Sequence, residues 1–367
     1  MQRIVWQIRY CWHRLTDGLE LQALWLQFKA EAEASTRPYR QDVALAPVES
    51  EKSSTRPFKL FRALLVAILA KLSPARRVFL LAILFVATLS IMGVEFLFIT
   101  KQVEFLIAFG SLLVLLILVL GDHVTMKRDI EIAREIQRWL VPRVPPEVPG
   151  IDMAFATRPA QTVAGDYYDA FRRTKNGPLL LAVADVSGKS VPAAMLMANF
   201  QASLRALAGS PGTLSELVTN LNRLVCANNL NGRGFTTAFI AELDPATGEL
   251  TYLSAGHNPP ILLREDGTIE RLQSESIPLG IEFTETFPTK TMFLHPEDLL
   301  FIYTDGVPEA RCPKGRQFGE ERLLAALQPR LKERAATTLA GIMKKLDEFV
   351  GLASQHDDIT CLLVARK

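Results

Sequence analysis

Two apolar stretches separated by three residues constrain the fold of this chain more than any other feature. Residues 78–99 span 22 positions, of which only four are not apolar, and Glu95 is the one charged member. A membrane-spanning helix needs about 20 consecutive, mostly apolar residues. Residues 103–120 form a second apolar run at the short end of that range. The sequence therefore predicts two transmembrane helices, at about 78–99 and 103–120, joined as a tight hairpin.

The charges that flank these stretches predict an orientation. Six Lys or Arg residues and no acid lie within 56–77, five more lie within 125–143, and Lys101 stands alone at the hairpin tip. Cytoplasmic flanks carry the excess of Lys and Arg. Both chain ends are therefore expected in the cytoplasm, in a multi-pass arrangement. The alternative is a core hairpin buried in a large soluble protein, but the rest of the chain is too small to cover two such helices.

The remaining sequence divides around this membrane region, which we place at residues 58–124. Residues 1–57 combine an amphipathic helical pattern with a Pro- and Ser-rich linker, and residues 125–142 form a helical linker that ends at a proline. Residues 143–367 are long enough for one full domain. A helix such as 125–140, with apolar residues at helical spacing between charges, is able to pair with its own copy, so we expect a homodimer through it.

Charge and cysteine content exclude several classes of function. Lys and Arg total 41 against 39 Asp and Glu. This balance gives no basic field of the kind that attracts nucleic acid, so no nucleic-acid partner is expected. The four cysteines have neither metal-ligand nor redox spacing. We therefore expect neither a disulfide framework nor a zinc site.

The C-terminal domain has an α/β pattern with short strands joined by tight turns. The turn at residues 244–248 reads Asp-Pro-Ala-Thr-Gly between two strand-like runs, which predicts a hairpin. Strand pairs of this kind, with helices grouped rather than alternating, favour antiparallel sheet. The expected strands are 179–186, 236–243, 249–254, 299–304 and 359–365, and the expected helices are 192–208, 214–229 and 337–352.

Aspartates stand next to predicted strands in four separate parts of the chain: Asp166 and Asp169 in Gly-Asp-Tyr-Tyr-Asp, Asp185 at the end of 179–186, Asp305 after 299–304, and the pair Asp357 and Asp358 before the last strand. Each motif taken alone is more often a turn than a ligand. Together, side chains at strand ends can converge at the rim of a sheet, and ligation by oxygen alone favours Mg²⁺ or Mn²⁺ over zinc. Two such ions would generate a hydroxide and clamp a phosphoryl group for in-line attack.

The order of these motifs resembles the SpoIIE-type branch of the metal-dependent PPM serine/threonine phosphatases. The resemblance covers about residues 130–367. It rests on Gly-Asp-Tyr-Tyr-Asp at 165–169, Asp-Val-Ser-Gly-Lys at 185–189, Val-Pro-Ala-Ala at 191–194, Phe-Thr-Thr at 235–237, Ala-Gly-His-Asn-Pro-Pro at 255–260, Pro-Leu-Gly at 278–280, Tyr-Thr-Asp-Gly-Val-Pro-Glu-Ala at 303–310 and Asp-Asp-Ile-Thr at 357–360.

That resemblance implies a four-layer αββα sandwich of two antiparallel sheets, with two Mn²⁺ or Mg²⁺ ions at its edge. It implies that the ligands are Asp166, Asp185, Asp305, Asp357 and the Val186 carbonyl, with Asp185 bridging both ions. Asp185 and Asp166 are then the residues on which catalysis depends. Residues that could share or support these roles are Asp169, Asp358, Gly306, Lys189 and His257.

The chain departs from the family pattern at three positions. Ser187 stands where eukaryotic-type members have a histidine that is often assigned as general acid, so another group must supply that proton. Ser190 and Ala164 each stand where the branch usually has glycine. A methyl group at 164 narrows the loop before Asp166 and reduces its flexibility.

Together with the predicted membrane hairpin, the resemblance implies a phosphatase anchored in the inner membrane of a bacterium. Its substrate would be a phosphorylated protein, such as a phosphorylated anti-sigma-factor antagonist. Two alternatives remain at this point: a catalytically silent membrane signalling scaffold of the same fold, and an unrelated metal-dependent hydrolase of small phosphate esters.

Overall fold

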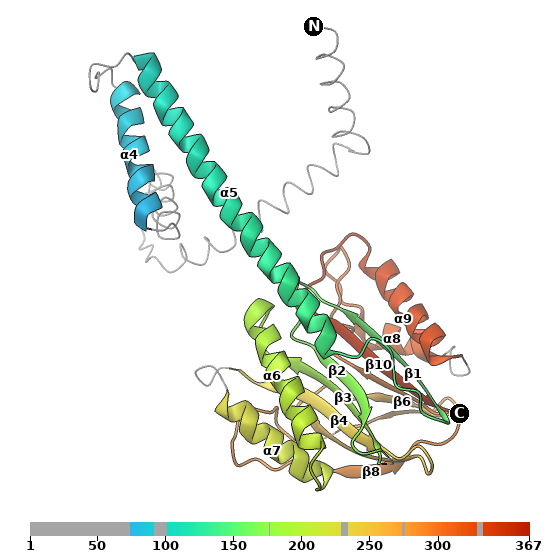
Figure 1. Ribbon diagram of the computed structural model, residues 1–367. Coiled ribbons are helices and arrows are strands. Elements are labelled where there is room, and N and C mark those ends of the chain that lie inside the picture. The colour runs from blue at the N-terminus through green and yellow to red at the C-terminus, as the bar shows by residue number, and fades with distance from the viewer. Residues whose placement is uncertain (1–73, 92–100, 176, 229–233, 274–275, 329–332) are drawn as a thin grey trace, which may run out of the picture. The chain divides into compact units, whose positions relative to one another are not determined.

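The computed structural model describes residues 74–91, 101–175, 177–228, 234–273, 276–328 and 333–367 (Figure 1). The predicted segment 1–57 and the end of the first predicted span lie outside these residues. The chain divides into two compact units, Met1–His123 and Val124–Lys367. Each unit is described separately below.

The first unit contains two helices that the sequence predicts as a hairpin. Helix α4 covers Pro74–Ile91, and helix α5 begins at Lys101. An ion pair between Arg76 and Asp122 joins the start of α4 to α5. Among the described residues, one helical segment, Phe105–Leu140, is long and apolar enough to cross a membrane.

Helix α5 (Lys101–Leu140) is a single helix of 40 residues. The sequence predicts a span at 103–120 and a separate linker helix from 125, and this division is wrong at the level of secondary structure. The polar residues that suggest a boundary, from Gly121 to His123, continue the helix. One glycine in a helix costs only about 1 kcal/mol, which long helical flanks on both sides offset.

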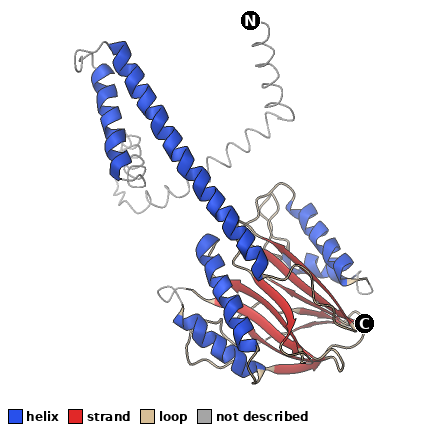
Figure 2. Cartoon of the chain, in the orientation of Figure 1, coloured by secondary structure: helices blue, strands red, loops and turns tan. Residues whose placement is uncertain are grey.

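The second unit is built on two five-stranded antiparallel sheets (Figure 2). One sheet has the order β1-β10-β9-β6-β7 and the other the order β2-β3-β4-β5-β8. The strands are β1 (Ile151–Arg158), β2 (Tyr167–Arg172), β3 (Leu179–Val186), β4 (Thr236–Leu243), β5 (Glu249–Ala255), β6 (Ile261–Leu263), β7 (Ile269–Arg271), β8 (Lys290–Phe293), β9 (Leu299–Tyr303) and β10 (Ile359–Arg366). The helices are α6 (Ser190–Ala208), α7 (Leu214–Ala227), α8 (Gly319–Leu327) and α9 (Ala335–Val350).

Three apolar clusters fill the spaces between four layers. The first joins inward side chains of both sheets, such as Val183 and Ile302. The second packs α6 and α7 on the β2–β5 side, and the third packs α8 and α9 on the β1–β10 side, as Figure 1 shows. Strands whose alternate residues face different layers need apolar side chains on both faces, which explains their near-continuous hydrophobic runs. The predicted αββα sandwich is confirmed.

Local sequence explains where several of these elements begin and end. Thr213 and Glu216 form a capping box at the start of α7, in which each side chain bonds the other's main-chain N–H. The predicted hairpin at residues 244–248 is also present, closed by Gly248 with a φ of 81°. Its Asp244 side chain accepts the N–H of Ala246. The chain reverses there as the turn residues predict.

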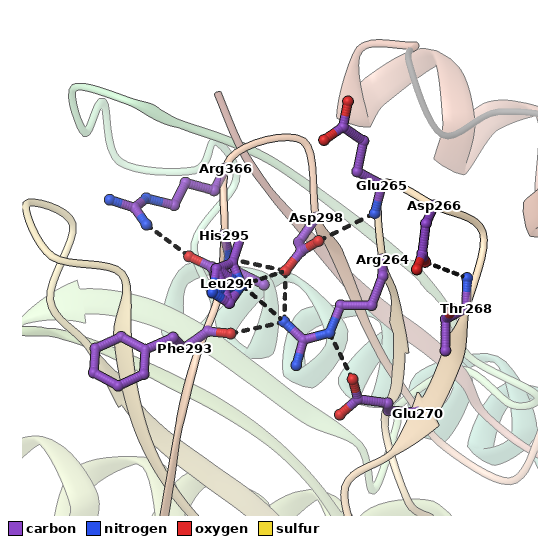
Figure 3. A network of polar contacts seen from close by, with 10 residues as sticks. All are labelled: Arg264, Glu265, Asp266, Thr268, Glu270, Phe293, Leu294, His295, Asp298 and Arg366. Atoms are coloured by element: carbon purple, nitrogen blue, oxygen red, sulfur yellow. Dashed lines mark hydrogen bonds and ion pairs between the residues drawn. The ribbon is translucent and has the colours of Figure 1, made fainter.

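A buried network fixes the start of β9 (Figure 3). Asp298 is 2% exposed and accepts hydrogen bonds from Arg264 Nη1 at 2.7 Å and from the His295 main-chain N–H at 2.8 Å. Arg264 also donates to Glu270 at 2.6 Å. The guanidinium neutralises the buried carboxylate, so this acidic residue is already satisfied by the protein itself. The opposite end of the same strand leads to Asp305.

Candidate active site

The site lies where two strand pairs end, one in each sheet. In the β2–β3 ladder Tyr167 faces Ala184, so Asp166 comes just before β2 next to Asp185 near the end of β3. In the other sheet Tyr303 at the end of β9 faces Cys361 of β10. Residues that follow β9 and precede β10 therefore meet at one edge, and these are the positions of Asp305 and Asp357. The fold brings the four predicted aspartates to one end of the sandwich.

A threonine links the two sheets at this end. Thr304 Oγ1 donates to Asp166 Oδ2 at 2.9 Å and accepts the main-chain N–H of Thr360 at 3.0 Å. Asp166 is 5% exposed, so its position depends on this bond. Sequence reasoning did not single out Thr304, although it stands inside the Tyr-Thr-Asp-Gly motif.

Glycines allow the backbone to pack closely at the site. A Cβ at Gly306 would lie 1.9 Å from the main-chain oxygen of Asp358, so no larger residue fits without a shift of the chain. A Cβ at Gly165 would lie 3.0 Å from the carbonyl oxygen of Val186. Glycine at 165 therefore leaves the Val186 oxygen uncovered on that side. The role of Gly306 is therefore steric. It lies next to the predicted ligand Asp305 and is not itself one of the predicted ligands.

The carboxylates perturb one another strongly. Burial, and then the charges of Asp305, Asp357 and Asp358, raise the pKa of Asp185 to about 7. Burial and then the charge of Asp185 raise the pKa of Asp166 well above its usual value. Burial followed by the charge of Asp357 raises the pKa of Asp305. Ionised carboxylates that lie close together and are partly buried repel one another, and a nearby positive charge is required to stabilise them.

The donor set fits hard divalent cations. It consists of carboxylates and the Val186 carbonyl, beside which Gly165 leaves room, and these are oxygen ligands of the kind that Mg²⁺ and Mn²⁺ prefer. Within the described part of the chain, no three His, Cys, Asp or Glu side chains converge into a ready-made ligand set. Two of the carboxylates instead bond protein groups, Asp166 with Thr304 and Asp357 with Lys189.

Asp358 anchors the loop that carries Asp166. Its two carboxylate oxygens accept the main-chain N–H groups of Ala160 and Gly165, both at 2.7 Å. Burial has the largest effect on Asp358 and raises its pKa above the usual value, although these two hydrogen bonds act to lower it. Both oxygens are engaged in holding the loop, which favours a supporting role for this residue.

The C-terminal end of α5 holds the same loop from the other side. Gln137 accepts the N–H of Ala164 at 2.9 Å and donates to the carbonyl of Ala164 at 2.7 Å. Tyr168 in β2 donates to the Pro142 carbonyl just beyond the helix. Gln137 was not expected at the site, although it lies in the predicted helical linker 125–142.

Asp169 faces away from the cluster. It is fully buried on the face of β2 that packs against α6, where Arg205 donates to both of its oxygens at 2.7 Å. The Tyr167 hydroxyl donates to the same carboxylate. Since all of these bonds satisfy a carboxylate that is fully buried, the contacts support a structural role for Asp169 rather than a share in metal binding.

The loop after β3 carries the remaining predicted residues. Lys189 donates to Asp357 Oδ2 at 3.0 Å and to the carbonyl of His356 at 2.7 Å. Ser187, at the place of the familiar histidine, accepts the N–H of Phe235. Ser190 adopts a φ of 68°, a left-handed conformation that glycine favours. This conformation explains why related sequences place glycine there.

His257 is placed in the turn between β5 and β6 and is only 7% exposed. Its Nδ1 lies 3.0 Å from Thr237 Oγ1. Burial lowers the pKa of His257 to about 4, while the Tyr303 main chain acts weakly in the opposite direction. The ring is therefore neutral near pH 7, which argues against its serving as a proton donor there.

Comparison with known families decides the assignment. The model of the family described as Stage II sporulation protein E (SpoIIE) matches residues 175–367. The chain belongs to the SpoIIE family. Asp185, Asp305 and Asp357 fall inside the matched segment, whereas Asp166 lies just before it.

Individual relatives extend the likeness beyond this segment. Protein IcfG of Synechocystis sp. is 29% identical over 307 residues, covering 76% of this chain and 46% of IcfG. Phosphoserine phosphatase RsbU of Bacillus subtilis is 29% identical over 255 residues, covering 67% of this chain and 72% of RsbU. The chain thus spans about half the length of IcfG and most of RsbU.

A solved structure supports the fold. The SiaA-PP2C domain of Pseudomonas aeruginosa superposes with a TM-score of 0.60 at 19% identity, covering 67% of this chain and 98% of that domain. At this level of identity the likeness concerns the fold. The PP2C-type sandwich of this solved domain is therefore the fold that is found here, in agreement with the assignment to the SpoIIE family.

Proposed function

We propose that residues 143–367 hydrolyse phosphoserine or phosphothreonine in a protein, using two Mn²⁺ or Mg²⁺ ions held by Asp166, Asp185, Asp305 and Asp357. The acidic cluster is the observation that carries this proposal, because burial and mutual repulsion raise the pKa values of three of its members. Divalent cations relieve such repulsion. The Val186 carbonyl, beside which Gly165 leaves room, would complete an all-oxygen donor set.

When bound, such ions supply Lewis-acid catalysis for the attack of water on phosphorus. The protein itself positions the carboxylates: Thr304 orients Asp166, and the ladder between β2 and β3 places Asp166 beside Asp185. Lys189 is held at Asp357, at the rim of the cluster. From there its ammonium group is suited to contact a phosphoryl oxygen of the substrate.

The substrate class follows from the family. RsbU of Bacillus subtilis is named a phosphoserine phosphatase, and we propose the same activity here, in a signalling role. A phosphorylated anti-sigma-factor antagonist is the partner that we propose. A direct test compares a phosphoserine protein of this kind with p-nitrophenyl phosphate, using the full-length chain. Preference for the phosphoprotein supports the proposal, hydrolysis of small esters alone contradicts it, and no hydrolysis with either ion favours a silent scaffold.

We also propose that the chain is anchored in the inner membrane of a bacterium by a hairpin at about 78–99 and 103–120. The apolar side chains of α5 are widely exposed; Phe105, Leu106 and Ile117, for example, are 65%, 64% and 58% exposed. Exposed apolar surface of this extent is rare in water-soluble proteins. Membranes washed with alkaline carbonate should retain the full-length chain, and its release would contradict the anchor.

The region 125–142 is proposed as a dimerising link between the anchor and the catalytic domain. Ile132, Ile136 and Trp139 are exposed and follow each other at spacings of four and three, as in a coiled-coil seam. A cysteine at 136 should then form an intermolecular disulfide in membranes. A cysteine at Arg138, a neighbouring position off that seam, is the matched control, and equal crosslinking of both variants would contradict a specific dimer.

Gln137 connects this link to the site, because it bonds both main-chain groups of Ala164 in the loop before Asp166. We propose that input from the bilayer, from a membrane partner or from residues 1–57 reaches the site through this contact. Gln137→Ala should make phosphatase activity insensitive to Ile136→Cys crosslinking. Equal sensitivity of the variant and the parent protein would exclude this route.

A further inference from the structure

His257 occupies a position between the two halves of the site that its motif alone does not explain. The turn that carries it connects β5 of one sheet with β6 of the other. Its ring is buried, and within the described residues Nε2 makes no hydrogen bond of good geometry, although the Tyr303 main chain lies beside the ring. A buried polar atom without a partner costs about 1–3 kcal/mol, so its retention needs a reason.

One side of the ring contacts the strand beside Asp185. Thr237, whose hydroxyl lies 3.0 Å from His257 Nδ1, is the direct register partner of Asp185 in the β3–β4 ladder. Side chains that face each other across an antiparallel pair lie on the same side of the sheet. That side is the one facing the other sheet, because Val183 and Phe239, two residues along each strand, belong to the core between the sheets.

The other side of the ring reaches the strand that leads to Asp305. The Tyr303 main chain lies beside the ring, where a backbone hydrogen bond acts to raise the pKa of His257 against the larger, lowering effect of burial. Tyr303 is the last residue of β9, and it is followed directly by Thr304, which holds Asp166, and by Asp305. The imidazole is thus placed between the strand end that carries Asp185 and the one that carries Asp305.

We propose that His257 is a positioning residue: through Thr237 on one sheet and the end of β9 on the other, it sets the separation of Asp185 and Asp305 and so the affinity of the site for divalent ions. This inference rests on the proposed metal-dependent function. The ring acts in its neutral form and touches neither substrate nor carboxylate. Groups that orient ligands from outside typically change metal affinity by about 10–100-fold when they are lost.

The decisive experiment measures Mn²⁺ affinity by electron paramagnetic resonance in the full-length protein, purified in detergent. Two matched pairs of variants separate the effect of losing the hydrogen bond from the effect of changing the volume of the side chain. Thr237→Val removes the hydroxyl at nearly constant volume, whereas Thr237→Ser keeps it. His257→Asn places an amide atom near the position of Nδ1, whereas His257→Gln places one near Nε2 and cannot reach Thr237 in the same way.

We expect Thr237→Val and His257→Gln to weaken Mn²⁺ binding about tenfold or more, and Thr237→Ser to stay within about threefold of the parent protein. His257→Asn keeps the contact with Thr237 but loses the one with β9, so its Mn²⁺ affinity should fall between these two limits. Equal Mn²⁺ affinity of Thr237→Val and Thr237→Ser, with both folded in circular dichroism, would overturn the inference. If the parent protein binds no Mn²⁺, and Asp185→Asn changes nothing, the proposed function itself fails.

Discussion

Replacing Asp185 with asparagine should stabilise the metal-free protein while removing its function. The pKa of Asp185 rises from an ordinary value of 3.8 to about 7, because of burial and then the nearby carboxylates. Between these two values the folded protein binds more protons than the unfolded chain, so the free energy of unfolding falls as pH rises through this window. At about 1.36 kcal/mol per pH unit, the ionised carboxylate costs the fold up to about 4 kcal/mol at pH 8.

Asparagine keeps the shape of the side chain and removes this charge. Because neighbouring carboxylates share the repulsion, we expect a gain of about 2–4 kcal/mol in the free energy of unfolding at pH 8 in EDTA. The gain should shrink towards pH 4, where the aspartate of the parent protein is protonated in the folded state. A stabilising substitution at a functional position is the signature of a site built for a bound cation rather than for stability.

Pulsed thiol labelling of Cys361 across a urea gradient measures this change in the full-length protein, since that thiol is fully buried in β10. Asp298→Asn is the matched control. Asp298 is more deeply buried than Asp185, at 2% exposed, and its charge is neutralised by Arg264, so its substitution should destabilise the fold by at least about 1 kcal/mol. The reasoning is refuted if Asp185→Asn unfolds at the same or a lower urea concentration than the parent protein at pH 8.

Three further substitutions test individual contacts. Arg205→Leu should destabilise the domain by about 3 kcal/mol, because it leaves the buried Asp169 charge unpaired; unchanged urea unfolding would exclude the ion pair as a structural element. Ser190→Gly should stabilise the domain by about 0.5–1 kcal/mol by relieving the left-handed conformation, and a loss of stability would argue against that strain. Gly306→Ala should abolish phosphatase activity, since its Cβ would collide with the Asp358 carbonyl; near-normal turnover would show that the loop can shift without harm.

Local pattern predicts antiparallel strands with acidic residues beside their ends, and in the fold Asp185, near the end of β3, and Asp305, just after β9, lie at the same edge. The four-layer αββα arrangement came from the family resemblance, because strand pattern indicates antiparallel sheet but not how the layers stack. Family resemblance added the choice of Asp166 and Asp357 as partners.

The roles of neighbouring acids could not be predicted, because they depend on which face each side chain occupies. Asp166 and Asp169 are three residues apart, but β2 begins between them and directs Asp169 towards Arg205 on α6. That arginine is 36 positions away in sequence. The continuity of α5 was missed for a related reason, since residues 121–123 break the apolar pattern without breaking the helix.

The hydrogen-bond partners of the site residues could not be predicted from sequence pattern either. Thr304 bonds Asp166, which is 138 positions away in sequence, and Gln137 bonds Ala164, which is 27 positions away. Nothing in the periodicity of either segment indicates such a contact. His257 was noticed as part of a motif, but its burial and its bond to Thr237 appear only once the two sheets are packed.

The most direct test of the account is the release of inorganic phosphate from a phosphoserine protein by the full-length chain. We predict release with Mn²⁺ or Mg²⁺, loss of release in EDTA, and at least about a thousandfold loss in Asp185→Asn, which corresponds to about 4 kcal/mol of transition-state stabilisation. Release that continues in EDTA, or that survives in Asp185→Asn, would contradict the claim that this carboxylate cluster is the catalytic centre.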